Sequence, residues 1–126
     1  MSTSPKKVLI LEDEPALNKV VSNKLRASGY EVLSLTDGTD AISFIKKKKP
    51  DLILLDLVMP KIDGFTVLKE LKDDPELKDI VVIVLSNLSQ DTDVDSVLAL
   101  GAKEFLVKSD TPLSIVLEMV DKYIKN

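Results

Sequence analysis

The 126-residue sequence contains no cysteine and no histidine. Without cysteine, a disulfide framework, a thiolate metal site and a cysteine nucleophile are all excluded. Without histidine, imidazole metal ligands and imidazole bases are excluded as well. Any chemistry at a site of this protein must therefore use carboxylates, hydroxyls and lysines.

Long apolar runs are also missing. No run approaches the roughly 18 residues of a membrane-spanning helix, and the opening residues MSTSPKK are not followed by the apolar segment of a signal peptide. We therefore expect a soluble, cytoplasmic protein. The net charge of −4 argues against affinity for nucleic acid or an anionic membrane. Partners are expected to be proteins or small ligands.

The sequence does contain enough apolar residues, 44%, for one sizeable core. We expect a single domain over residues 1–126, in which residues 1–6 form a loose tail. Short β-branched or leucine-rich runs predict strands, and apolar residues spaced three and four apart predict helices. The predicted strands are 8–11, 31–35, 51–56, 80–86 and 104–108. The predicted helices are 15–28, 38–48, 64–72, 90–100 and 112–124, and Ser89 is the expected cap of the fourth.

Strict alternation of buried strands with amphipathic helices predicts an α/β fold, a doubly wound five-stranded parallel sheet with helices on both faces. In such open sheets, ligands bind beyond the carboxyl ends of the strands. Polar residues follow four of the predicted strands at that edge: Glu12, Asp13 and Glu14 after the first, Asp56 at the end of the third, Ser86 and Asn87 at the fourth, and Lys108 at the fifth.

Asp56 interrupts an apolar run, and a carboxylate buried there would be costly without a partner. If the strand order is 2-1-3-4-5, the first and third strands are neighbours about 4.8 Å apart, which brings Asp13 and Asp56 within reach of one ion. Oxygen ligands favour a hard cation, and Mg²⁺ is the usual one. Beside a cation, a lysine and a hydroxyl, Asp56 is a potential nucleophile toward a phosphoryl group.

The stretches LEDE, DLVMPKIDG, VLSN and EFLVK resemble the receiver domain of bacterial two-component response regulators, a flavodoxin-like, CheY-like fold. The resemblance extends over nearly the whole chain. It implies a phosphoprotein in phosphorelay signal transduction, which receives its phosphoryl group from a sensor histidine kinase or a histidine phosphotransfer protein. Such a protein is a phosphoacceptor rather than an enzyme.

The resemblance also implies a role for each matching residue. Asp56 would be the phosphorylated aspartate, Asp13 and Asp56 direct Mg²⁺ ligands, Glu12 a second-shell or water-mediated ligand, and the backbone carbonyl of Val58 a further ligand. Two residues would respond to the phosphoryl group: Ser86 as the switch hydroxyl and Phe105 as the switch aromatic. Lys108 would contact a phosphoryl oxygen.

Three positions depart from the commonest receiver pattern. Ser109 stands directly after Lys108, at a position where the family usually has a proline in a cis bond. The replacement of proline by serine affects the loop that directs the lysine. Asn87 stands where a smaller residue is more frequent and would narrow access to the site. Glu12 replaces a frequent aspartate.

Val58 and Leu88 lie two residues beyond Asp56 and Ser86, at positions that in receivers flank the path of the hydrolytic water. Because apolar side chains cannot orient that water, we predict slow self-dephosphorylation.

Three other functions compete with this reading. A Mg²⁺ phosphohydrolase of the haloacid dehalogenase type needs a second aspartate two residues after the nucleophile, where this chain has Val58. A flavodoxin-like flavin binder needs a loop rich in Ser, Thr and Gly after the first strand, whereas this chain has EDEPA, which would repel a phosphate. A receiver-like docking module that is never phosphorylated is the third.

The expected protein is a stand-alone receiver, because the last predicted helix ends near Asn126. Its output would be intermolecular, through a face formed by residues 90–124. That face would bind an unknown downstream protein or a second copy of the chain.

Overall fold

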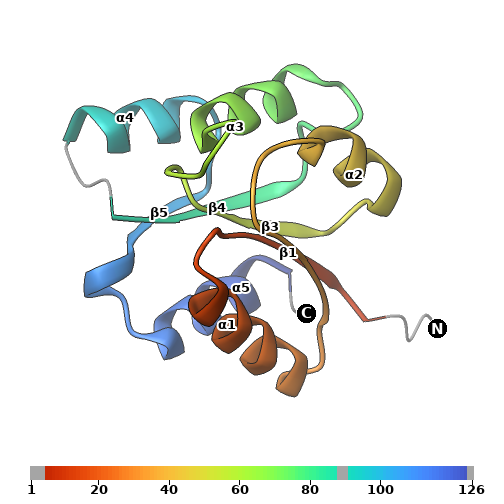
Figure 1. Cartoon of the computed structure of the whole chain (residues 1–126), viewed down its shortest axis with the longest axis vertical. Coiled ribbons are helices and arrows are strands. Elements are labelled where there is room, and N and C mark those ends of the chain that lie inside the picture. Colours follow the sequence, from red (N-terminus) through yellow and green to blue (C-terminus); the bar gives the residue numbers. More distant parts are fainter. Residues whose placement is uncertain (1–4, 88–90, 125–126) are drawn as a thin grey trace.

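The computed structural model describes residues 5–87 and 91–124, in which strands and helices alternate along the chain (Figure 1). The strands are β1 (Lys7–Leu11), β2 (Glu31–Leu35), β3 (Leu52–Leu55), β4 (Val81–Ser86) and β5 (Glu104–Val107). The helices are α1 (Pro15–Ala27), α2 (Ala41–Lys48), α3 (Gly64–Asp73), α4 (Asp91–Ala99), the short 3-10 helix η1 (Lys108–Asp110) and α5 (Leu113–Ile124).

The five strands form one parallel sheet in the order β2-β1-β3-β4-β5. This confirms the predicted doubly wound fold and strand order. Leu11 at the end of β1 is in register with Leu55 at the end of β3, and Leu55 is in register with Val84 of β4. The segments that follow β1 and β3 therefore begin side by side at one edge of the sheet, and β4 continues two residues further, to Ser86.

Two apolar cores lie on the two faces of the sheet. Alternate residues of each strand point to opposite faces, so Leu9 and Leu11 pack with residues of α2, α3 and α4, whereas Val8 and Ile10 pack with residues of α1 and α5. Figure 1 shows the same division, with α1 and α5 below the sheet and α2, α3 and α4 above it. Because helices cover both faces of the sheet, a ligand site is expected beyond the carboxyl ends of the strands.

The helix predicted over 38–48 begins later, at Ala41. The loop before it is packed against the loop that follows β3, since a Cβ added to Gly38 would lie 2.6 Å from the backbone oxygen of Ile62. Asp40, the residue before the helix, has a left-handed backbone with φ 62°. Tertiary packing of this turn therefore overrides the apolar periodicity that predicted the earlier start.

Lys6, the last residue of the predicted loose tail over residues 1–6, is held by the sheet. The carbonyl of Lys6 accepts a hydrogen bond of 2.9 Å from the amide of Glu31, so the chain is tied to β2 from this residue onward. Residues 1–4 and the predicted cap Ser89 lie outside the described residues. None of the helices in 5–87 and 91–124 has the length and apolar character needed to span a membrane.

Candidate functional site

Asp56 lies directly after β3 and is only 4% exposed. Its amide donates to the carbonyl of Leu11, so the pairing of β3 with β1 continues through this residue. Oδ1 accepts a hydrogen bond of 3.1 Å from the amide of Val58. The carboxylate that interrupts the apolar run thus faces the edge of the sheet rather than the core.

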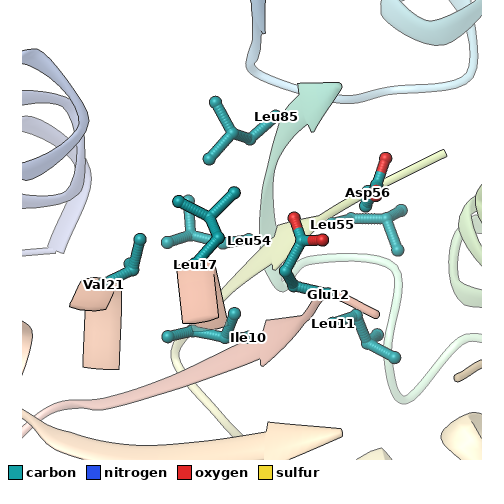
Figure 2. A pocket seen from close by; sticks show the side chains of 9 residues that line it. All are labelled: Ile10, Leu11, Glu12, Leu17, Val21, Leu54, Leu55, Asp56 and Leu85. Carbon is teal, nitrogen blue, oxygen red and sulfur yellow. The ribbon is translucent and has the colours of Figure 1, made fainter. Parts of the chain in front are cut away.

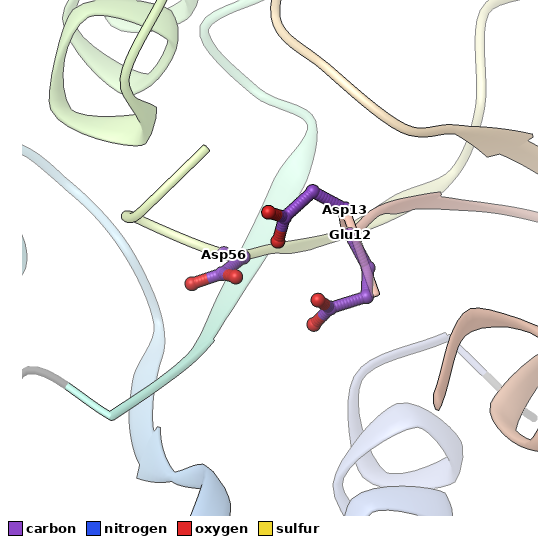
Figure 3. Close-up of side chains that lie close together, drawn as sticks. All are labelled: Glu12, Asp13 and Asp56. Atoms are coloured by element: carbon purple, nitrogen blue, oxygen red, sulfur yellow. The ribbon is translucent and has the colours of Figure 1, made fainter. Parts of the chain in front are cut away.

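Three carboxylates converge at this edge. Oxygens of Glu12, Asp13 and Asp56, one from each residue, lie within 4.8 Å of one another. Figure 3 shows Glu12 and Asp13, from the segment after β1, on one side of Asp56. The side chains of Glu12 and Asp13 extend toward the side on which Asp56 lies. This geometry follows from the register of Leu11 with Leu55, which sets the ends of the two strands level.

Lys108 brings a positive charge to these carboxylates. Its Nζ lies 2.7 Å from Oε1 of Glu12, 3.0 Å from Oδ2 of Asp56 and 3.3 Å from Oε1 of Glu14. Only 9% of the Lys108 side chain is exposed. Burial alone would lower the pKa of Lys108, but its ion pairs with Glu12 and Asp56 raise it above the ordinary lysine value, so the ammonium stays charged.

Glu12 is buried on its other side by apolar side chains (Figure 2). It borders a cavity of about 10 Å³ lined mainly by leucine, isoleucine and valine, including Leu17, Leu54 and Leu55. That volume is at the lower limit for holding one water molecule. Burial raises the pKa of Glu12, and the charge of Asp56 adds to this, while Lys108 opposes both. Three carboxyl groups, those of Glu12, Asp13 and Asp56, thus cluster beside a single lysine.

Asn18 of α1 supports the end of β1 from beneath, and the sequence analysis did not single it out. Its Nδ2 donates to the backbone carbonyl of Glu12 at 3.1 Å, and its Oδ1 accepts from the hydroxyls of Ser34 (2.7 Å) and Ser22 (3.2 Å). Asn18 is buried. A buried, fully engaged amide of this kind fixes the backbone from which Glu12 and Asp13 extend. The only signal in the sequence is an asparagine next to the apolar stripe of the helix.

Gly64 is the first residue of α3 and packs directly against the backbone of Asp56 and Leu57. A Cβ at this position would lie 2.3 Å from the backbone oxygen of Asp56 and 2.6 Å from Cα of Leu57. The amide of Gly64 donates to the carbonyl of Leu57, and Asp63 caps the helix by accepting from the amide of Thr66. The glycine is required because the start of α3 and the end of β3 approach more closely than a side chain permits.

The structure places Ser86 and Phe105 near this edge on the adjoining strands. Ser86 ends β4 and is fully buried, in register with Val107 of β5. Phe105 is partly buried against the core formed with α2, α3 and α4. Their predicted roles as switch residues concern a change between two states, and these stay predictions.

An open pocket of about 320 Å³ lies above the acidic cluster. It is lined by Asp13, Glu14, Asp56, Val58, Asn87 and Lys108. The side chain of Val58 is 54% exposed, so the predicted apolar flank of the pocket is present on this side. Leu88, the predicted second flank, lies outside the described residues. The role of the Val58 carbonyl as a ligand stays a prediction.

The loop that carries Lys108 has Ser109 at the position where the sequence analysis expects a proline in most receivers. Every peptide bond within 5–87 and 91–124 is trans, and residues 108–110 form η1. Lys108 nevertheless reaches Asp56. The amide of Ser109 donates to Oδ1 of Asn87 at 3.0 Å, a contact that the sequence analysis missed although it had noted both residues separately.

A parallel five-stranded sheet with an acidic cluster and a buried lysine at its carboxyl edge defines the receiver type of α/β protein. A family model described as "Response regulator receiver domain" matches residues 8–119. The chain belongs to this family of two-component signalling proteins.

Solved receivers have the same fold over nearly their whole length. The Mn²⁺-bound form of response regulator Rcp1 superposes with a TM-score of 0.86 at 33% identity, covering 97% of this chain and 96% of that one. Chemotaxis protein CheY4 of Vibrio cholerae gives a TM-score of 0.87 at 26% identity, covering 96% and 100%.

Curated relatives are longer. The probable transcriptional regulator ycf27 of Porphyridium aerugineum is 36% identical over 126 residues, which cover 95% of this chain and 51% of that protein. The DNA-binding dual master transcriptional regulator RpaA of Synechocystis is 39% identical over 102 residues, covering 81% and 42%. The chain spans about half the length of the curated relatives it matches.

Proposed function

We propose that this receiver domain accepts a phosphoryl group on Asp56 from a phosphohistidine of a sensor histidine kinase or a histidine phosphotransfer protein, in a Mg²⁺-dependent reaction. The observation that supports this best is the convergence of three carboxylates and one buried lysine on the pocket at the end of β3. The same residues would make the domain a phosphoacceptor with at most slow self-dephosphorylation, rather than an enzyme with its own substrate.

The donor set fits Mg²⁺. The oxygens of Glu12, Asp13 and Asp56 are hard ligands that lie close enough together to share one ion, and Asp13 is accessible from solvent. We assign Asp13, Asp56 and the carbonyl of Val58 as direct ligands and Glu12 as a ligand through water. Bound there, Mg²⁺ supplies positive charge to the oxygens of an incoming phosphoryl group. Three clustered carboxyl groups beside a single lysine support a bound cation.

The transfer itself needs little from the protein beyond positioning. A carboxylate oxygen of Asp56 forms a bond to phosphorus while the bond from phosphorus to the donor's imidazole nitrogen breaks. The electron pair of that bond stays with the ring, which is protonated on its other nitrogen and leaves as neutral imidazole. The donor must supply the imidazole, since this chain has no histidine. Lys108, 3.0 Å from Asp56, is in position to neutralise a phosphoryl oxygen.

Phosphorylation adds close to two negative charges at Asp56. We infer that the hydroxyl of Ser86 turns toward the phosphoryl group and that Phe105 moves with it. Both residues adjoin the face formed by α4, β5 and α5, which is the proposed docking face for a downstream protein or a second copy of the chain.

Intact-protein mass spectrometry after incubation with acetyl phosphate tests the proposal. We expect one phosphoryl adduct that forms only with Mg²⁺ and is absent from Asp56→Asn. The matched control is Asp95→Asn, at an exposed acid of α4, which should be modified like the wild type. A wild-type protein that gains no adduct under any condition would instead support a docking module that works without phosphorylation.

A second prediction concerns the lifetime of the phosphoryl group. Val58→Asn places an amide at an exposed position of the pocket wall, where it can hold the hydrolytic water, so we expect self-dephosphorylation about tenfold faster. The loss of the adduct after removal of acetyl phosphate measures this rate. Val58→Ala, which adds no polar group, serves as the control. An unchanged lifetime in Val58→Asn would contradict the role given to Val58.

A further inference from the structure

A side-chain hydrogen bond joins the loop after β4 to the loop after β5. The amide of Ser109 donates to Oδ1 of Asn87, with 3.0 Å between nitrogen and oxygen. The donor is a backbone N–H, which any residue except proline has. Two of the three departures from the usual receiver pattern noted in the sequence, Asn87 and Ser109, are therefore the two halves of one contact.

This contact is here called the Asn87–Ser109 bridge. It lies directly beside Ser86 and Lys108, the two residues proposed to interact with the phosphoryl group. The pairing of β4 with β5 runs as far as Ser86 opposite Val107. Asn87 follows the first of these residues, and Lys108 and Ser109 follow the second. The bridge thus extends the link between the two strands beyond their ends, immediately past Lys108.

We infer that Asn87 is a positioning residue for Lys108. The lysine has a flexible four-carbon stem, and its ammonium is shared among Glu12, Glu14 and Asp56 at 2.7 to 3.3 Å. Holding the backbone on its carboxyl side restricts the directions from which the stem can reach Asp56. The inference rests on the proposed function only for its consequence in phosphorylation, since the bridge and the ion pairs are present without it.

An alternative role for Asn87 gives the opposite expectation. Its side chain also lines the pocket above Asp56, where it would narrow the entry of a phosphodonor. If access dominated, truncating Asn87 would accelerate phosphorylation. If positioning dominates, truncation slows phosphorylation, and it does so only when Lys108 is present.

A double-mutant cycle between Asn87→Ala and Lys108→Ala tests the inference on the full chain. The first readout is chemical unfolding, which needs no phosphoryl transfer. Asn87→Ala removes the hydrogen bond in either background. If Asn87 also positions Lys108, Asn87→Ala should raise the unfolding equilibrium constant about threefold more in the wild type than in the Lys108→Ala background. The second readout is the rate of adduct formation with acetyl phosphate, which should fall by a similar factor and only when Lys108 is present.

Ser109→Ala is the matched control, because it keeps the backbone donor and should match the wild type in both readouts. Faster amide hydrogen exchange at Ser109 in Asn87→Ala would verify directly that the bridge has been lost. Additive effects in the unfolding cycle, or faster phosphorylation of Asn87→Ala, would overturn the inference. A wild type that gains no adduct would defeat the proposed function, while the unfolding cycle would still decide whether Asn87 positions Lys108.

Discussion

Lys108→Ala is expected to lower the free energy of unfolding by about 3 kcal/mol and the rate of phosphorylation by about a hundredfold. The ammonium lies 2.7 Å from Glu12 and 3.0 Å from Asp56, both only 4% exposed. Removing it leaves two buried carboxylates with no lysine between them, which costs far more than losing a surface ion pair. It also removes the group proposed to neutralise a phosphoryl oxygen.

The same substitution gives a test of the cation site that does not depend on phosphorylation. A divalent cation bound among Glu12, Asp13 and Asp56 would neutralise carboxylates that Lys108 has left unpaired. Mg²⁺ should therefore raise the Tm of Lys108→Ala by more than it raises the Tm of the wild type, which thermal unfolding with and without Mg²⁺ measures. Lys69→Ala, which removes an exposed i,i+4 ion pair with Asp73, is the control and should cost under about 0.5 kcal/mol. If Mg²⁺ raised the Tm of none of the three proteins, the result would argue against a cation at this cluster.

Gly64→Ala is expected to destabilise the domain by about 3 kcal/mol, because overpacking at a site with no room forces the backbone apart. The added Cβ would lie 2.3 Å from the carbonyl oxygen of Asp56, and the neighbour there is backbone rather than a flexible side chain. The displacement falls on the acceptor residue itself. Adduct formation with acetyl phosphate should therefore fall at least tenfold under conditions in which the variant is folded.

Gly29→Ala separates backbone strain from overpacking. Gly29 has φ +97° and no neighbouring atom within 4 Å of an added Cβ, and it lies in the turn between α1 and β2. That variant should lose about 1 kcal/mol from strain alone and keep the wild-type rate of adduct formation. Chemical denaturation and the adduct assay on both variants check this pair. A Gly64→Ala protein that is phosphorylated like Gly29→Ala would show that the close packing of α3 on Asp56 does not position the acceptor.

The sequence predicted the sheet and its edge well because both follow from simple patterns. Apolar runs alternating with amphipathic helices left few ways to bury the strands, and the order β2-β1-β3-β4-β5 brought Glu12, Asp13 and Asp56 together as expected. The contact of Lys108 with Asp56 also follows from strand spacing and the length of its stem.

What the sequence did not predict depends on loops and on single side-chain contacts. The later start of α2 follows from a backbone contact of Gly38 with Ile62, residues 24 positions apart, which no local periodicity records. The Asn87–Ser109 bridge joins loops 22 positions apart. The amide of Asn18 supports Glu12 through its backbone, a role that residue type alone does not indicate.

The ion pairs of Lys108 also have a consequence for the order in which the site forms. Lys108 is 52 positions from Asp56 and 94 from Glu14, and it follows the last strand of the sheet. During synthesis, β1 and β3 leave the ribosome before β5, so the carboxylates can be brought together before their lysine exists. Contacts over such sequence separations carry the entropic cost of closing a long loop. A nascent or partly folded chain would present the acids without their counter-charge, and only the completed domain would be competent to receive a signal.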